Sequence, residues 1–179
     1  MERVDYGKQF LLKKDVKEIA KYKKEFDNQM IEGDLKVVAT TSRIMKKRIN
    51  FVKKHIDAIL KKDFDFKTKD KYQTDADKRK FVHSEKDLKK RWTRLMKYEV
   101  LTQYFDLEDE QNGVNQDKKK KKKKKKVAKK AEKKKTKKQL MVSAREKIQK
   151  RYDRVFKRLL EERKSDQIDK FYNSIARVY

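Results

Sequence analysis

Turn-forming residues are scarce in this chain, and that scarcity limits its possible folds more than any other feature. Its 179 residues include no proline and only three glycines, Gly7, Gly33 and Gly113. Sheets of many strands need tight turns, and tight turns depend on glycine and proline. We therefore predict an all-α chain: an irregular helical bundle of about five helices, with one extended segment and a disordered lysine-rich loop.

The missing residue types also exclude several kinds of chemistry. None of the glycines lies in a glycine-rich phosphate loop, which excludes Rossmann-type and P-loop nucleotide sites. The chain has no cysteine, so it has no disulfide, thiolate zinc site or cysteine nucleophile. Its two histidines, His55 and His83, are far apart in sequence and predict neither a metal site nor a special role. We expect no cofactor and no metal.

The positive charge is concentrated in one stretch. Of the net charge of +27, residues 118–138 supply +15, because they hold 16 lysines and one acid, Glu132. Such a stretch could bind nucleic acid through its phosphates or the head groups of anionic lipids. It could also be a tolerated expansion of a surface loop, since long insertions cost little closure entropy. The sequence leaves these alternatives open.

Apolar residues at spacings of three and four predict helices on both sides of this stretch. Asp15 is expected to cap the first helix, and Ser84, with Asp87 three residues later, the third. Alternation in Asp63-Phe64-Asp65-Phe66 predicts an extended segment over residues 63–83 that lies on the bundle. The expected helices are 15–32, 34–62, 84–105, 139–163 and a last one that begins after Ser165.

These elements predict one helical domain with an insertion. Residues 1–106 form its first part and residues 139–179 its second part. Residues 107–138 form a low-complexity, lysine-rich insertion, which is expected to be disordered because like charges repel and no apolar core can form. No apolar run is long enough for a signal peptide or a membrane span.

The serines do not predict a catalytic site. A serine nucleophile needs a positioned base and an oxyanion hole, which is usually built from a glycine-containing turn. No such turn accompanies any candidate, so we expect no catalytic residue in this chain. The candidates are Ser42, Ser84, Ser143, Ser165 and Ser174.

Acidic residues of the extended segment resemble a calcium loop only superficially. An EF-hand loop needs glycine at its sixth position and glutamate at its twelfth. Counted from Asp63, these positions hold Thr68 and Thr74. We interpret the acids as solvated surface charges: Asp63, Asp65, Asp70, Asp75 and Asp77.

Three aromatic residues of the third helix allow two interpretations. Trp92, Tyr98 and Tyr104 could form a base-stacking platform beside the lysines. Aromatic residues at helical spacing are more often part of a core, and we favour a core role.

Taken in order, five blocks of the chain resemble a known family. They are Val4 to Val16, Asp63 to Phe66, Ser84 to Leu88 with Trp92 and Lys97 to Leu101, Arg151-Tyr152, and Phe171 to Tyr179. Together they resemble the N-terminal helical domain of carboxy-terminal processing peptidases, the tail-specific proteases of bacterial envelopes. In that family the last block leads into an Asp-Pro-His signature. The lysine-rich stretch departs from the family's pattern and looks like an insertion.

The resemblance implies a non-catalytic scaffold. The parent enzyme would be a serine-type endopeptidase of the periplasm or cell envelope, in which a PDZ domain captures the C-terminal tail of a protein substrate. Its PDZ domain and its protease domain with a Ser/Lys dyad would lie outside this chain, as would a signal peptide. The helical domain would frame the substrate-entry side and dock an adaptor protein.

An alternative function from a different class stays open. The chain could be a free-standing basic helical module that binds nucleic acid non-specifically through Lys118 to Lys138. Anionic lipid is a further possible partner of the same lysines.

Overall fold

The computed structural model describes residues 4–24, 36–113 and 134–161, together with 166, 168, 169 and 173. Over these residues the chain forms four α-helices and one short 3-10 helix, η1 (Lys21–Lys24). Within the same ranges there is no β-strand, and a single isolated parallel bridge joins Leu12 to Val82. The prediction of an all-α fold is confirmed, and the described ranges hold four α-helices where about five were predicted for the chain. The α-helices are α1 (Lys13–Ala20), α3 (Lys36–Ile59), α4 (Glu85–Asn112) and α6 (Lys137–Leu160).

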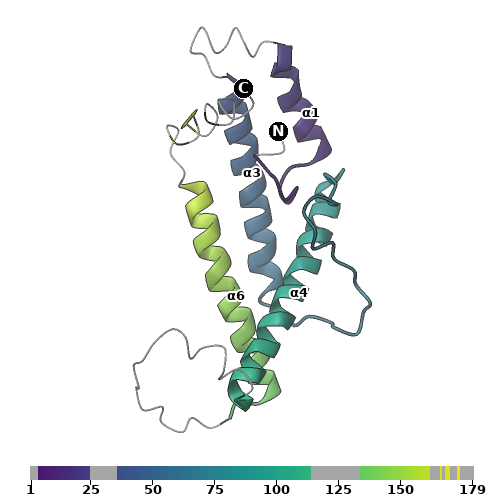
Figure 1. Cartoon of the computed structure of the whole chain (residues 1–179), viewed down its shortest axis with the longest axis vertical. Coiled ribbons are helices and arrows are strands. Elements are labelled where there is room, and N and C mark those ends of the chain that lie inside the picture. Colours follow the sequence, from purple (N-terminus) through teal and green to yellow (C-terminus); the bar gives the residue numbers. More distant parts are fainter. Residues whose placement is uncertain are drawn as a thin grey trace.

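Helices α3, α4 and α6 lie side by side as an elongated bundle, and α1 lies beside the upper end of α3 (Figure 1). The chain between α3 and α4 leaves the lower end of α3 and returns along the outer side of α4 (Figure 1). As predicted for residues 63–83, this segment is free of helix and strand apart from the bridge at Val82. None of the described helices combines the length and apolar character that a membrane span requires.

One apolar core joins the three long helices. Its buried residues recur every three or four positions, so that each helix turns one apolar stripe inward. A smaller cluster of Leu11, Ile19 and Ile44 attaches α1 to α3. The main core consists of Ile49, Val52 and Ile56 of α3, Leu88, Trp92, Leu95, Met96, Val100 and Tyr104 of α4, and Leu140, Ala144, Ile148 and Phe156 of α6, with Leu12 and Leu60.

Two predicted helix caps have different outcomes. The Ser84 hydroxyl accepts the N–H of Asp87 at 3.1 Å, which confirms Ser84 as the cap of α4. The prediction for Asp15 was wrong: α1 begins at Lys13, and Leu12 holds the capping position. Asp15 lies three residues after Leu12 and accepts its N–H at 2.8 Å, which is the second half of a capping box.

Helix α4 is longer than its predicted end near Phe105. It continues to Asn112 and ends at Gly113, whose φ of 78° is the left-handed conformation that glycine adopts without strain. Residues 107–110, which include three acids and which the sequence places in the low-complexity insertion, are therefore helical. Contacts within this last part support the helix, because the Tyr104 hydroxyl donates to Glu108 at 2.9 Å.

The last described helix also starts earlier than predicted. Thr136 caps α6, with Gln139 as its partner in a capping box, so the helix begins at Lys137 rather than near Gln139. The first helix, predicted to run to residue 32, ends at Ala20 and is followed by η1. Residues 25–35, most of the lysine-rich stretch and most of the last predicted helix after Ser165 lie outside the described residues.

Candidate functional site

The most organised polar region of the structure surrounds residues 5–12, which we call the N-terminal loop. The Asp5 carboxylate accepts the backbone N–H groups of Gln9, Phe10 and Leu11, each at 2.8 Å. Lys8 turns the chain with a φ of 50°, and its N–H donates to the Asp5 carbonyl at 2.8 Å. Asp5, only 5% exposed, therefore folds the loop around its own side chain.

Side chains from far along the sequence hold the carbonyl groups of the same loop. Arg79 donates to the Gly7 carbonyl at 3.1 Å, and Arg91 donates to the Lys8 carbonyl. The indole N–H of Trp92 donates to the Gln9 carbonyl at 2.8 Å. Three consecutive carbonyls thus have partners on α4 or just before it, and the loop is fixed to the bundle by its backbone.

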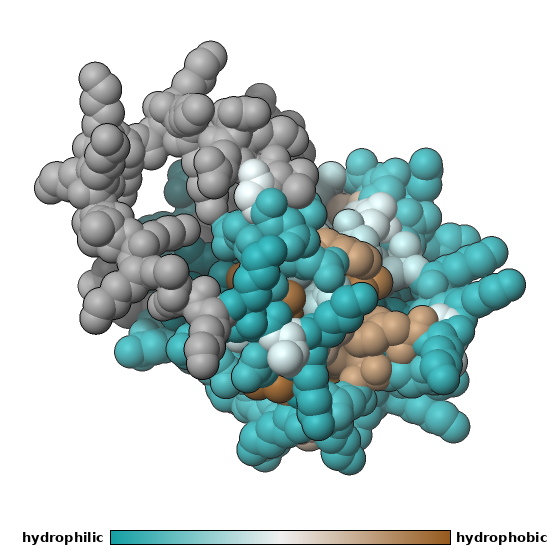
Figure 2. All heavy atoms as spheres, turned by 90° about the horizontal axis from the view of Figure 1, so that it is seen from below, coloured by the Kyte–Doolittle hydropathy of each residue, from teal (hydrophilic) through white to brown (hydrophobic). Residues whose placement is uncertain are grey.

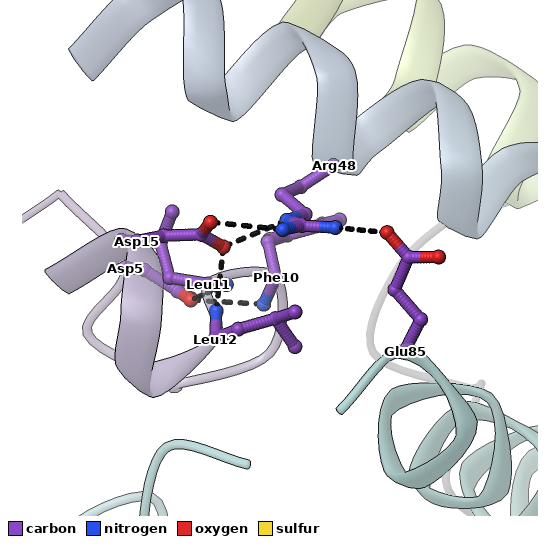
Figure 3. Close-up of polar contacts among 7 residues, drawn as sticks. All are labelled: Asp5, Phe10, Leu11, Leu12, Asp15, Arg48 and Glu85. Atoms are coloured by element: carbon purple, nitrogen blue, oxygen red, sulfur yellow. Dashed lines mark hydrogen bonds and ion pairs between the residues drawn. The ribbon is translucent and has the colours of Figure 1, made fainter. Parts of the chain in front are cut away.

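A buried arginine secures the end of the loop (Figure 3). Arg48 of α3 donates to both carboxylate oxygens of Asp15, at 2.7 and 2.8 Å, and to Glu85 at 2.6 Å. The Arg48 and Asp15 side chains are 2% and 5% exposed, whereas Glu85 is 46% exposed. This pair connects α1, α3 and the start of α4.

The charges of this pair stabilise one another. Burial raises the pKa of Asp15, but hydrogen bonds from Arg48 and the Leu12 N–H, together with the Arg48 charge, outweigh burial and hold that pKa below its usual value. The hydrogen bond to Asp15 raises the pKa of Arg48 against the opposing effect of burial. Both groups are therefore charged at neutral pH.

We call the six side chains that hold the loop the clasp: Asp5, Asp15, Arg48, Arg79, Arg91 and Trp92. Their polar atoms are engaged by the chain itself, and no buried side-chain nitrogen or oxygen in the described residues is left unpaired. A site of this kind fixes geometry. It presents no exposed nucleophile or base, so its chemistry is that of a structural anchor.

The structure describes three of the five candidate serines, and they lie in or at the start of three different helices. Ser84 is a helix cap, and Ser42 lies within α3. Ser143 accepts a hydrogen bond from Lys135 at 3.3 Å, and the contact is exposed. A lysine that activates a serine has to be desolvated, and Lys135 is exposed. Ser165 and Ser174 lie outside the described residues.

The acidic residues of the extended segment have separate partners. Within the described ranges no three His, Asp or Glu side chains are grouped so that they could hold a metal ion. Three of the acids fasten the segment to other elements: Asp63 pairs with Arg145 at 2.8 Å, Asp70 with Lys97 and Arg94, and Asp77 accepts from Tyr6 at 2.8 Å. The other two have partners within the segment: Asp75 pairs with Lys78 at 3.4 Å, and Asp65 accepts the Lys67 N–H at 2.9 Å.

The aromatic residues divide between core and surface. Trp92 is 2% exposed and contacts the rings of Phe10 and Tyr152, with centroids 5.4 and 5.8 Å away, so it belongs to the core. Tyr104 is also buried. Tyr98 is 51% exposed and stacks on Tyr72, with centroids 6.3 Å apart. The three residues therefore do not form one stacking platform.

Several residues of the site were not predicted. Arg48 lies four residues after Ile44 and four before Val52, within the apolar stripe of α3, and a cation at such a position is a signal for a buried ion pair. His55 was expected to have no special role, yet its Nε2 lies 2.9 Å from the Thr93 hydroxyl and links α3 to α4. Burial lowers the pKa of His55. For Arg79 and Arg91, no local pattern reveals partners more than 70 residues away.

Comparison with known protein families identifies the domain. The model of the tail specific protease N-terminal domain matches residues 1–179, the whole chain. The chain therefore belongs to the family of tail-specific protease N-terminal domains. No curated protein matches the sequence.

Proposed function

We propose that this chain is the non-catalytic scaffold of a serine-type protease in the bacterial periplasm or cell envelope. In the proposed enzyme, a PDZ domain captures the C-terminal tail of a protein substrate, and a separate domain with a Ser/Lys dyad cleaves it. The helical domain frames the substrate-entry side and docks an adaptor protein. The match of the whole chain to the N-terminal domain of tail-specific proteases carries this proposal.

The clasp supports a scaffold role. Its donors and acceptors are used to hold the N-terminal loop, so the region offers a defined shape rather than a reactive group. The buried Arg48–Asp15 pair ties α1 to α3, and Arg48 also contacts Glu85 at the start of α4. A rigid frame of this kind positions neighbouring domains without taking part in the chemistry.

An activity assay tests whether this chain takes no part in the cleavage itself. The isolated chain, incubated with an unstructured protein that has an apolar C-terminus, is expected to release no fragments, while the parent protease cleaves it. Cleavage by the rigorously purified chain would overturn the proposal. Fractionation of cells that express the parent protein tests the proposed envelope location.

A substrate comparison tests the scaffold role itself. In the parent protease, Arg48→Met is expected to slow cleavage of a long protein while cleavage of a short peptide that reaches the dyad unaided is unchanged. Equal loss on both substrates would contradict a framing role. Ser42→Ala, a substitution in α3 outside the clasp, is the matched control.

A further inference from the structure

The extended segment between α3 and α4 consists of two halves that are held in different ways. We call its first half, residues 63–72, the strap, and its second half, residues 73–82, the anchored half. The segment leaves the lower end of α3 and runs along the outer side of α4 (Figure 1). Seen from that lower end, the molecule shows apolar residues between charged ones, so apolar side chains reach the surface at the end where the strap begins (Figure 2).

Arginine side chains bind the backbone of the anchored half. Arg79 donates to the carbonyls of Gln73 and Thr74, at 2.9 and 2.6 Å. Arg91 of α4 donates to the Lys80 carbonyl at 2.6 Å. Because both arginines also hold the N-terminal loop, this half of the segment is tied to the clasp.

The backbone of the strap is held differently. Every backbone hydrogen bond that the structure describes for residues 63–72 stays within the strap: the Lys67 N–H donates to the Asp65 carboxylate and the Asp70 N–H to the Thr68 carbonyl, each at 2.9 Å, and the Thr68 hydroxyl donates to the Asp65 carbonyl at 3.3 Å. Seven of its ten residues are exposed and none is fully buried. Segments with few buried contacts and a solvent-exposed backbone open at a lower free energy than a helical core.

Side chains fasten the strap to the bundle. Asp63 pairs with Arg145 of α6 at 2.8 Å, although Asp63 is 84% exposed. Asp70 pairs with Lys97 of α4 and with Arg94 at 3.7 Å. Exposed ion pairs contribute little to stability, and salt weakens them further. Three partly buried aromatic rings of the strap pack against the main core: Phe64, Phe66 and Tyr72.

We propose that the strap opens and closes as a unit while the helices and the anchored half stay folded, and that salt favours the open form. Opening uncovers Lys97, whose side chain is only 13% exposed and donates to Thr68 at 2.7 Å. It also uncovers the part of the core on which the three rings pack. The strap is thus a conformational switch that exposes apolar surface of the bundle without unfolding it. The inference rests on these contacts and does not depend on the proposed protease function.

Thiol labelling measures the opening. The chain has no cysteine, so Lys97→Cys introduces a single thiol beneath the strap, and Val100→Cys introduces one in the core, where Val100 is 0% exposed. The Lys97→Cys thiol is expected to react at least about a hundredfold faster than the Val100→Cys thiol and at least about tenfold slower than in the unfolded chain, because local opening costs less than global unfolding.

Urea separates the two kinds of opening. The reaction of the Lys97→Cys thiol should change little in moderate urea, since opening of the strap exposes little surface, whereas the reaction of the Val100→Cys thiol should accelerate steeply. Equal rates with equal urea dependence overturn the proposal, because the strap would then open only when the domain unfolds. A Lys97→Cys rate as high as in the unfolded chain also overturns it, because the strap would then not cover α4.

Two substitutions test whether the strap moves by itself. Phe66→Ala removes a ring of the strap and is expected to accelerate the Lys97→Cys reaction about tenfold, since part of the packing that holds the strap closed is lost. Ile148→Val, in the core of α6, should accelerate the Val100→Cys reaction about two- to tenfold and leave the Lys97→Cys reaction within about twofold. Equal acceleration of both thiols by Ile148→Val overturns the proposal. Circular dichroism verifies that each variant is folded.

Salt dependence tests the ion pairs. Between about 0.05 and about 0.5 M sodium chloride, the Lys97→Cys reaction is expected to accelerate about threefold, because screening weakens the ion pairs that this substitution leaves in place. Asp63→Asn with Asp70→Asn should abolish the salt dependence. Asp75→Asn is the matched control and should preserve it, since Asp75 pairs with Lys78 inside the anchored half. A salt dependence that survives the loss of both strap acids overturns the proposed effect of salt.

Discussion

The N-terminal loop and the three-helix core are held by different forces. The loop is fixed by hydrogen bonds and charges: Asp5, Arg79 and Arg91 bind its backbone, and Arg48 binds Asp15 at its end. The core of α3, α4 and α6 is held by apolar side chains that lose contact with water. The two regions should therefore respond differently to pH and to the loss of a side chain.

Trp92 is the point at which the two regions meet. Its rings pack against Phe156 in the core, and its N–H donates to the Gln9 carbonyl in the loop. Hydrophobic packing is roughly independent of pH, whereas a buried ion pair requires both partners to be charged. Substitutions can therefore separate what hydrophobic packing and the buried ion pair each contribute to the free energy of unfolding.

The largest expected effect is at this shared residue. Trp92→Ala removes a core ring and a loop anchor together, and it is expected to lower the free energy of unfolding by ~3–5 kcal/mol. Urea denaturation followed by circular dichroism measures the loss. Trp92→Phe keeps an aromatic ring but loses the N–H, so it should cost less. Equal losses for both variants would contradict the view that the core supplies most of the effect.

A somewhat smaller loss is expected from breaking the buried ion pair. Arg48→Met leaves Asp15 buried without its partner and should cost about 3 kcal/mol. Asp15→Leu combined with Arg48→Met removes both charges and should recover part of that loss, which a double-mutant cycle measures. Glu85→Gln is the control, because Glu85 is 46% exposed and its removal should cost less than about 1 kcal/mol.

Acid should weaken the clasp before it weakens the core. The pKa of Asp15 is lowered in the folded chain, so its contribution is complete above the pKa of an unfolded aspartate and is lost as the pH falls through the folded value. The difference in unfolding free energy between wild type and Asp15→Asn should therefore shrink below about pH 4. The difference between wild type and Trp92→Ala should stay constant over the same range. Parallel urea titrations at each pH test both statements.

Loss of one helix cap should have a modest effect on both regions. Ser84→Ala removes the hydroxyl that accepts the Asp87 N–H and is expected to cost about 1 kcal/mol. Ser84→Asn, which keeps an acceptor, should recover most of this loss. Thermal denaturation of the wild type and both variants measures these changes. Equal melting temperatures for the wild type and Ser84→Ala would show that the cap contributes nothing.

The smallest effect is expected in the lysine-rich stretch, outside both regions. Deletion of Lys118–Lys126 shortens the connection between α4 and α6, and halving such a connection changes the closure free energy by only about 0.6 kcal/mol. The unfolding midpoint in urea should therefore be nearly unchanged. A shift as large as that of Ser84→Ala would mean that these lysines contribute to the stability of the fold.

Local patterns predicted the core better than the clasp. The burial of Trp92 and the cap at Ser84 follow from spacing and residue type within one helix, and both are present. Arg48 was missed because its partners, Asp15 and Glu85, are 33 and 37 residues away. The end of α4 was misplaced because an acidic composition at a helix C-terminus opposes the helix dipole. Contacts that depend on the folded arrangement cannot be recognised from neighbouring residues.

The distance between the loop and its anchors has a consequence for how the chain folds during synthesis. Trp92 and Arg91 lie 83 residues after the carbonyl groups that they bind. At about 5 to 20 residues per second, the ribosome needs roughly 4 to 17 s to add those residues. The N-terminal loop therefore cannot be anchored until the start of α4 has been made, and a nascent chain stalled before residue 92 should expose this loop to proteases.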